Sequence, residues 1–193
     1  MIFVIDTSSA LSAVALLDPA GRIEQEETAP SGPTFDLPSR YRAVKGASPL
    51  TRVAVATGPG SFTGLRVGVS FGLGLAVGLG IPIVPLGTLE LQAMRSDSPL
   101  LAVSEAGRGR VYFRRPDGSK DIGEPAELPR DWPAAGWLRP ATAAALEAAG
   151  VRFAAGGELR SFGAAAARLL ESAVDVPFGR LKLEYMQSMS VRT

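Results

Sequence analysis

The stretch Gly58-Pro-Gly-Ser-Phe-Thr-Gly-Leu-Arg-Val-Gly68 decides the fold predicted for this chain. An apolar strand pattern at residues 52–57 leads into it, and an almost uncharged helical pattern follows over residues 62–79. A strand, a glycine-rich turn and a helix N-terminus together typically form an anion site, because backbone N–H groups point outward there. The glycines nevertheless continue down the helix, at Gly64, Gly68, Gly72, Gly74 and Gly78.

The turn supports two interpretations. In the first, Gly58, Gly60 and Ser61 belong to a vestigial anion site, since the lysine of a GxxxxGK[ST] phosphate loop is missing and Arg66 could supply charge. In the second, the turn is a tight strand-to-helix connection in which Ser61 caps the helix and Pro59 restricts the backbone. The local physics favours the second interpretation.

The helical glycines need their own explanation, because each costs up to ~1 kcal/mol relative to alanine. Close approach of another backbone is the usual compensation. The glycine line therefore packs against this chain's own sheet or against a helix of another subunit, and both can hold on different faces. The residues predicted for a partner interface are Gly64, Arg66, Gly68, Val69, Phe71, Gly72, Leu73 and Ala76.

Around this motif, alternating and apolar patterns predict strands at residues 2–6, 11–17, 22–28, 53–57 and 81–86. Helices are expected at residues 37–45, 62–79 and 88–94, the last capped by Thr88. The order βββαβα followed by βα is typical of ribonuclease-H-like folds. Actin, sugar kinases and chaperone ATPases contain two such halves.

The second half is less regular. Strands are expected at residues 100–104, 110–114 and 151–155, and helices at 141–149 and 162–172. We therefore predict an α/β, actin-like ATPase fold with a ribonuclease-H-like lobe at residues 1–100. A smaller, degenerate lobe is predicted at residues 101–193.

Composition excludes several kinds of function. The 193 residues carry a net charge of +1, so no global field would capture nucleic acid. Cysteine and histidine are both absent, which removes thiolate metal sites, the commonest metal ligand and the commonest general base. A ribonuclease-H-type nuclease would need a carboxylate where residues 53–57 end in Thr57, so no metal site is expected.

The 23 residues between Arg66 and Glu90 carry no charge and are long enough to cross a bilayer. Gly80 and Pro82 break this stretch, which favours a core helix and a strand over a membrane span. The N-terminus lacks the basic region of a signal peptide. We therefore expect no membrane contact and a cytoplasmic location.

Two further sites could belong to a nucleotide-binding protein. Asp6, Thr7 and Ser8 end the first strand, where actin-like ATPases place a metal-organising aspartate and a phosphate turn. Gly156 and Gly157 lie where a second phosphate loop would be expected. The alternative is an ordinary polar turn, because the first turn has no glycine for close approach to phosphate. A small ATPase or kinase using Asp6 is the alternative function.

The chain resembles the TsaB family, non-catalytic partners in bacterial tRNA threonylcarbamoyladenosine (t6A) synthesis. The resemblance rests on residues 5–8, on the motif at 58–68, and on residues 78–82, 87–90 and 109–113. It implies a two-lobed actin-like fold and a scaffold or activator subunit without chemistry of its own. The implied partners are TsaD in a heterodimer, TsaE, tRNA through the complex, and a second copy in a homodimer.

The resemblance implies that the chain needs no cofactor. It also implies that a nucleotide could bind weakly, at the interface of the complex. The chain departs from the family between its third and fourth strands, where a short segment carries Arg40, Arg42 and Lys45 in place of a longer helix. Ser104 and Glu105 also stand where the family tends to place an aspartate.

Overall fold

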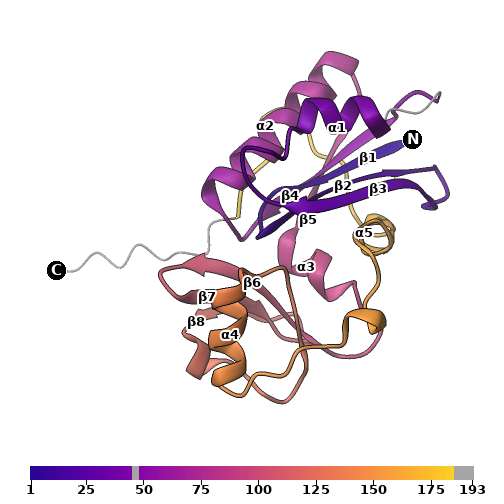
Figure 1. Cartoon of the computed structure of the whole chain (residues 1–193). Coiled ribbons are helices and arrows are strands. Elements are labelled where there is room, and N and C mark those ends of the chain that lie inside the picture. The colour runs from indigo at the N-terminus through magenta and orange to yellow at the C-terminus, as the bar shows by residue number, and fades with distance from the viewer. Residues whose placement is uncertain (45–47, 185–193) are drawn as a thin grey trace.

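The computed structural model describes residues 1–44 and 48–184, which form two sheets with helices around them (Figure 1). The first sheet has the order β3-β2-β1-β4-β5. Its strands are β1 (Ile2–Asp6), β2 (Leu11–Leu17), β3 (Ile23–Pro30), β4 (Arg52–Gly58) and β5 (Ile83–Gly87). The first three strands are antiparallel, whereas β1, β4 and β5 run parallel. This is the arrangement that the strand order predicts.

Helices cover both faces of this sheet because its central strands are buried on both sides. Helices α1 (Leu37–Val44) and α2 (Phe62–Leu79) pack on one face, over a core that contains Phe3, Ile5 and Val55. Helices α3 (Thr88–Ala93) and α5 (Phe162–Leu170) pack on the other. The predicted 37–45 helix ends at Val44 within the described residues, and Lys45 lies outside them.

Helix α2 has the bounds that its sequence predicts. The Ser61 side chain accepts a hydrogen bond from the Gly64 N–H, and Gly80 ends the helix in the left-handed conformation. Among the described residues, α2 is the helix long and apolar enough to cross a membrane. Here it packs along one side on the sheet and buries Leu65, Gly68, Gly72 and Ala76.

The second sheet has the order β8-β7-β6-β9, with α4 (Pro140–Ala148) packed beside it (Figure 1). Its strands are β6 (Leu101–Gly107), β7 (Arg110–Arg114), β8 (Lys120–Gly123) and β9 (Ala134–Ala135). The strand predicted at residues 151–155 is wrong, since this segment makes a single bridge from Phe153 to Ala134. The described residues also contain three short 3₁₀ helices: η1 (Pro125–Glu127), η2 (Gly156–Glu158) and η3 (Phe178–Arg180).

Helix α3 lies between the two sheets. Leu91 packs in the first sheet's core and Leu89 against the second sheet. The predicted cap of α3 is wrong: Gly87 is the N-cap, and the buried Thr88 hydroxyl instead donates to Ser8 Oγ at 3.0 Å. The chain returns to the first sheet through α5, so the boundary near residue 100 stays a prediction.

Candidate functional site

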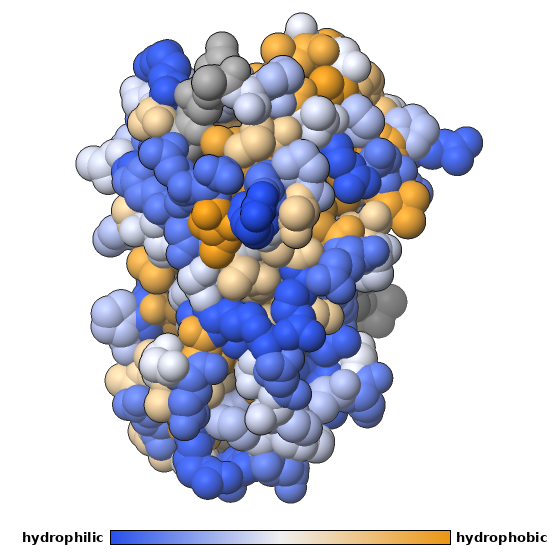
Figure 2. Space-filling view, turned by 90° about the vertical axis from the view of Figure 1, so that its right-hand side faces the viewer, coloured by the Kyte–Doolittle hydropathy of each residue, from blue (hydrophilic) through white to orange (hydrophobic). Residues whose placement is uncertain are grey.

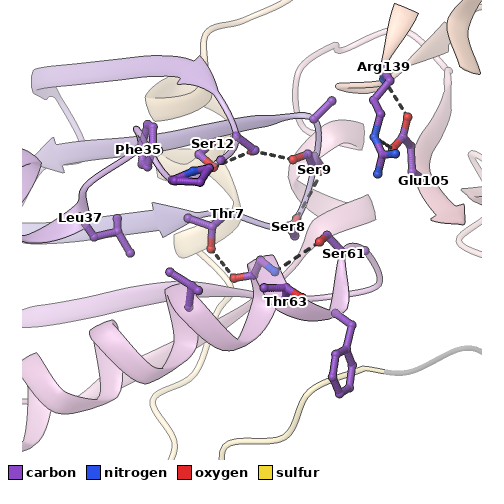
Figure 3. Close-up of a pocket in the computed structure, with 18 of the residues that line it drawn as sticks. Thr7, Ser8, Ser9, Ser12, Phe35, Leu37, Ser61, Thr63, Glu105 and Arg139 are labelled. Atoms are coloured by element: carbon purple, nitrogen blue, oxygen red, sulfur yellow. Dashed lines mark hydrogen bonds and ion pairs between the residues drawn. The ribbon is translucent and has the colours of Figure 1, made fainter. Parts of the chain in front are cut away.

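A cleft of about 1240 Å³ lies between the two sheets. The turn after β1, the loop before α1 and the first turn of α2 form one side (Figure 3). The end of β6, Tyr112 and Arg139 form the other. Many of its polar groups are hydroxyls. Ser31 Oγ donates to the Ser9 backbone carbonyl at 2.7 Å and forms a hydrogen bond with Ser12 Oγ at 2.6 Å.

Asp6 does not line this cleft. It is fully buried, and its Oδ1 accepts hydrogen bonds from Ser8 N at 2.8 Å and from Ser8 Oγ at 2.6 Å. Its Oδ2 has no partner among the described residues. Burial raises the pKa of Asp6, against the smaller lowering effect of the Ser8 hydrogen bonds. In this structure Asp6 therefore orders the turn beneath the cleft.

The turn after β1 is in direct contact with α2. Thr7 Oγ1 donates to the Gly64 carbonyl at 2.7 Å, and Ser61 N donates to the Ser8 carbonyl at 2.7 Å (Figure 3). A Cβ at Gly60 would overlap the Ser8 carbonyl oxygen, and a Cβ at Gly64 would overlap the Thr7 carbonyl oxygen. Thr7, Ser8, Gly60 and Ser61 of the predicted nucleotide or anion site therefore lie together, against Gly64 of the predicted interface. Their close packing explains the glycines without a ligand.

Gly58 stands at the end of β4 and has a different reason for its identity. Its φ is 112°, a conformation that favours glycine, and the Gly58–Pro59 peptide bond is cis. A Cβ there would lie 2.7 Å from the Glu184 carbonyl oxygen. The backbone near the C-terminal end of the described chain thus passes directly over this turn.

Gly68 and Gly72 of the predicted glycine line face the chain's own sheet. A Cβ on Gly68 would overlap Thr7 Oγ1, and one on Gly72 would overlap Val55 Cγ1. Gly68, Gly72 and Ala76 are buried within this chain, so their prediction as partner-contacting residues is corrected. Close approach of α2 to β1 and β4 is what these small residues permit.

The opposite side of α2 is exposed. We call Phe62, Val67, Ser70, Gly74, Val77 and Gly78 the outer surface of α2. Phe62, Val67 and Val77 retain 52%, 49% and 53% of their accessible area. A Cβ at Gly74 or Gly78 would meet no atom within 4 Å. The C-terminal end of α2 lies at the top of the molecule in Figure 1. Figure 2, which is turned about the vertical axis, shows a group of apolar residues at that same top end.

The remaining predicted interface residues flank this surface. The Arg66 guanidinium is exposed and lies 3.7 Å from the centre of the Phe62 ring. Val69, Phe71 and Leu73 are half-buried and pack against the sheet core. Gly74 and Gly78 were predicted as part of the glycine line but not as interface residues, and Val67 and Val77 were not in the predicted interface either. The sequence could have placed all four on this surface, because they lie on the helix face opposite Gly68 and Gly72.

Gly156 and Gly157 are not brought to the cleft. Both lie exposed in η2, and a Cβ on either would meet nothing within 4 Å. The cleft instead contains Glu105 and Arg139, which sequence reasoning did not single out as site residues. Arg139 Nε lies 2.9 Å from Glu105 Oε2, and Glu105 Oε1 accepts hydrogen bonds from Arg139 N and Thr142 Oγ1, both at 2.8 Å.

This pairing determines the charge of the cleft. Of the described residues that line it, Arg139 is the cation and Asp36 and Glu105 are the acids. The described lining of the cleft therefore carries a net negative charge, and its arginine is already paired with Glu105, so nothing in it favours a polyphosphate. In the described parts of the chain, no group of three or more acidic side chains is placed to hold a metal ion.

Comparison with known proteins places these features in context. Residues 43–127 match the family model for TsaD, tRNA N6-adenosine threonylcarbamoyltransferase. TsaB of Bacillus subtilis is 41% identical over 66 residues, which cover 33% of this chain and 29% of that protein. TsaB of Haemophilus influenzae is 29% identical over 122 residues, which cover 58% and 52%. The chain thus spans about half or less of the curated relatives that it matches.

The fold has close counterparts among solved structures. YeaZ from Pseudomonas aeruginosa superposes with a TM-score of 0.70 at 20% identity, covering 96% of this chain and 99% of that one. A second Pseudomonas aeruginosa structure, a protein similar to peptidase YEAZ, gives 0.69 at the same identity. These matches confirm the predicted resemblance to TsaB and the actin-like, ribonuclease-H-like fold.

Proposed function

Because this chain resembles TsaB in sequence and fold, we propose that it is a non-catalytic subunit of the machinery that makes t6A in tRNA. In this role it binds TsaD through the outer surface of α2 and supports threonylcarbamoyl transfer to the adenosine next to the anticodon. TsaE and tRNA associate with the complex, which works in the cytoplasm.

The observation that carries this proposal is the exposed apolar side of α2. Phe62, Val67 and Val77 each keep about half of their area in water. Gly74 and Gly78, one helical turn apart on the same side, leave room for another backbone. Apolar surface of this kind commonly marks a protein interface, and small residues four apart let two helices approach closely.

A groove of about 430 Å³ extends this surface toward α1. Tyr41, Phe71 and Leu75 contribute its apolar walls, with Gly74 beside them. A partner helix lying on α2 would therefore also reach α1, and could place an apolar side chain into the groove. The shortened segment that carries α1 still contributes to the proposed docking surface.

The non-catalytic role is supported by what the cleft presents. Asp6 is buried behind its turn, and Arg139 is paired with Glu105. The chain has no histidine to serve as a general base or metal ligand. These features also weigh against the alternative, a small ATPase or kinase that uses Asp6. A titration with ATP and magnesium tests that alternative, which would require binding that Asp6→Ala abolishes.

The docking proposal is tested by filling the glycine positions of the outer surface. In Gly74→Leu and Gly78→Leu, the new side chains extend into space that a partner helix would occupy. We expect each to weaken TsaD binding at least about tenfold, or ~1.4 kcal/mol, in calorimetry. Ala144→Leu is the control, because Ala144 is exposed on α4, away from α2.

Unchanged affinity for TsaD in both folded glycine variants would refute docking through this surface. Sedimentation with and without TsaD separates the heterodimer from a homodimer. A homodimer using the same surface would dissociate in Gly74→Leu and would also be displaced by TsaD.

A further inference from the structure

The C-terminal part of the described chain crosses from one side of the first sheet to the other. After α5, Val176 N donates to the Ile83 carbonyl at 3.0 Å along the outer edge of β5. Leu181 then packs in the core beneath α2. Finally, Glu184 N donates to the Thr57 carbonyl at 2.8 Å, at the end of β4. Residues 171–184 thus wrap the sheet edge, behind it in the view of Figure 1.

The side chain of Glu184 reaches the second sheet. Both of its carboxylate oxygens accept hydrogen bonds from Lys120 Nζ in β8, at 2.9 and 3.0 Å. Lys120 Nζ also lies 3.0 Å from Glu90 Oε1 in α3, and Arg114 Nε of β7 lies 3.4 Å from the same oxygen. One cluster therefore joins the second sheet, the helix between the sheets and the end of the wrapping segment.

These charges are partly shielded from water. The side chains of Lys120, Glu90 and Glu184 keep 23%, 26% and 36% of their area exposed. A lysine held by two carboxylates in such a place is constrained more strongly than an isolated surface pair. The backbone of Glu184 is meanwhile fixed to β4, so its side chain ties the second sheet to the first.

We propose that residues 171–184 are a strap that sets the angle between the two sheets, with the Glu184–Lys120 pair as its clasp. The width of the cleft depends on that angle, because the first turn of α2 and the end of β6 form opposite walls. Release of the clasp lets the second sheet swing relative to α2. This device is independent of the proposed docking to TsaD.

The test measures the distance across the cleft in the full chain. Thr63→Cys on α2 and Arg108→Cys at the β6–β7 turn place two spin labels on exposed sites, and the chain has no other cysteine. Glu184→Gln removes the charge of the clasp. The matched control is Asp175→Asn, which removes the Arg52–Asp175 pair, formed at 2.9 Å between the strap and the first sheet alone.

We expect Glu184→Gln to raise about fivefold the population of molecules with a larger distance between the labels, because it weakens the partly buried Glu184–Lys120 ion pair. Asp175→Asn should leave that population unchanged. Lys120→Met should reproduce the change, and combining it with Glu184→Gln should add little. An unchanged distance distribution in Glu184→Gln, or equal widening in Asp175→Asn, would overturn the proposal.

Discussion

Substitution of the buried helical glycine Gly72 by alanine tests why α2 carries glycine at all. The added Cβ would lie far closer than 3.0 Å to Val55 Cγ1 and 3.4 Å from both Ile5 Cδ1 and Val53 Cγ1. Val55 is a β-branched residue of a fully buried strand and has little freedom to turn away. The helix or the strand must therefore shift.

The magnitude follows from two opposing contributions. Overpacking a well-filled core by one methyl costs roughly 1–3 kcal/mol. Replacing glycine by alanine in a helix interior returns up to ~1 kcal/mol. The severe overlap with Val55 puts the overpacking cost in the upper part of its range, at about 2–3 kcal/mol. We therefore expect Gly72→Ala to lower the free energy of unfolding by about 1–2 kcal/mol, which lowers Tm by about 2–8 °C for a domain of this size.

Gly74 in the same helix supplies the matched control. A Cβ there meets nothing within 4 Å, so Gly74→Ala keeps only the helix-propensity gain and should raise Tm by about 2–4 °C. Urea and thermal unfolding followed by circular dichroism measure both variants. A neutral or stabilising Gly72→Ala would refute close packing on the sheet as the reason for this glycine. Adding Val55→Ala to Gly72→Ala should recover part of the loss.

Three other substitutions test the remaining features. Gly64→Ala should destabilise more than Gly72→Ala, because its Cβ would overlap a backbone carbonyl that cannot rotate away; an equal or smaller loss on urea unfolding would contradict this. Because burial raises the pKa of Asp6, the folded state binds its proton more tightly than the unfolded state, and stability should fall as pH rises from about 3.8, the ordinary pKa of an aspartate, through the raised pKa. Asp6→Asn keeps an acceptor for Ser8 and should flatten that slope in unfolding measured against pH. Glu105→Ala should cost about 0.5–1.5 kcal/mol on urea unfolding, because it removes the acceptor of the exposed Arg139 N–H at the start of α4.

Periodicity predicted most of the first sheet and its helices because each of these elements carries its own signal. The alternating and apolar strands lead to clear breaks, and Ser61 and Gly80 mark both ends of α2. The second sheet was harder because β9 has two residues and β8 four. Strands this short are determined by their neighbours in space. The prediction of a strand at residues 151–155 was wrong for the same reason. The apolar residues of this segment pack in the core, but its backbone makes a single β-bridge, from Phe153 to Ala134.

The sequence predicted several residues of the candidate site, but it did not predict how these residues are arranged. The i, i+4 glycine spacing correctly indicates close approach, but spacing within one helix cannot tell which partner approaches. Asp6 has the sequence context of a metal-organising residue, and its burial behind Ser8 is visible in the structure alone. The Glu105–Arg139 pair joins residues 34 positions apart, so no local pattern could reveal it.

Substitutions on the two faces of α2 test different properties. Those on the inner face test packing on the sheet, and those on the outer surface test the proposed docking. Gly64, Gly68 and Gly72 let the helix approach the sheet so closely that most of its inner side is made of small residues, with Leu65 as the large side chain buried there. Most large apolar side chains of α2 therefore lie on its flanks and outer surface, where Val67 and Val77 are about half exposed. A helix with larger residues on its inner side could have buried its apolar content within one chain. The glycines that first suggest a phosphate loop therefore position the surface that we propose for docking.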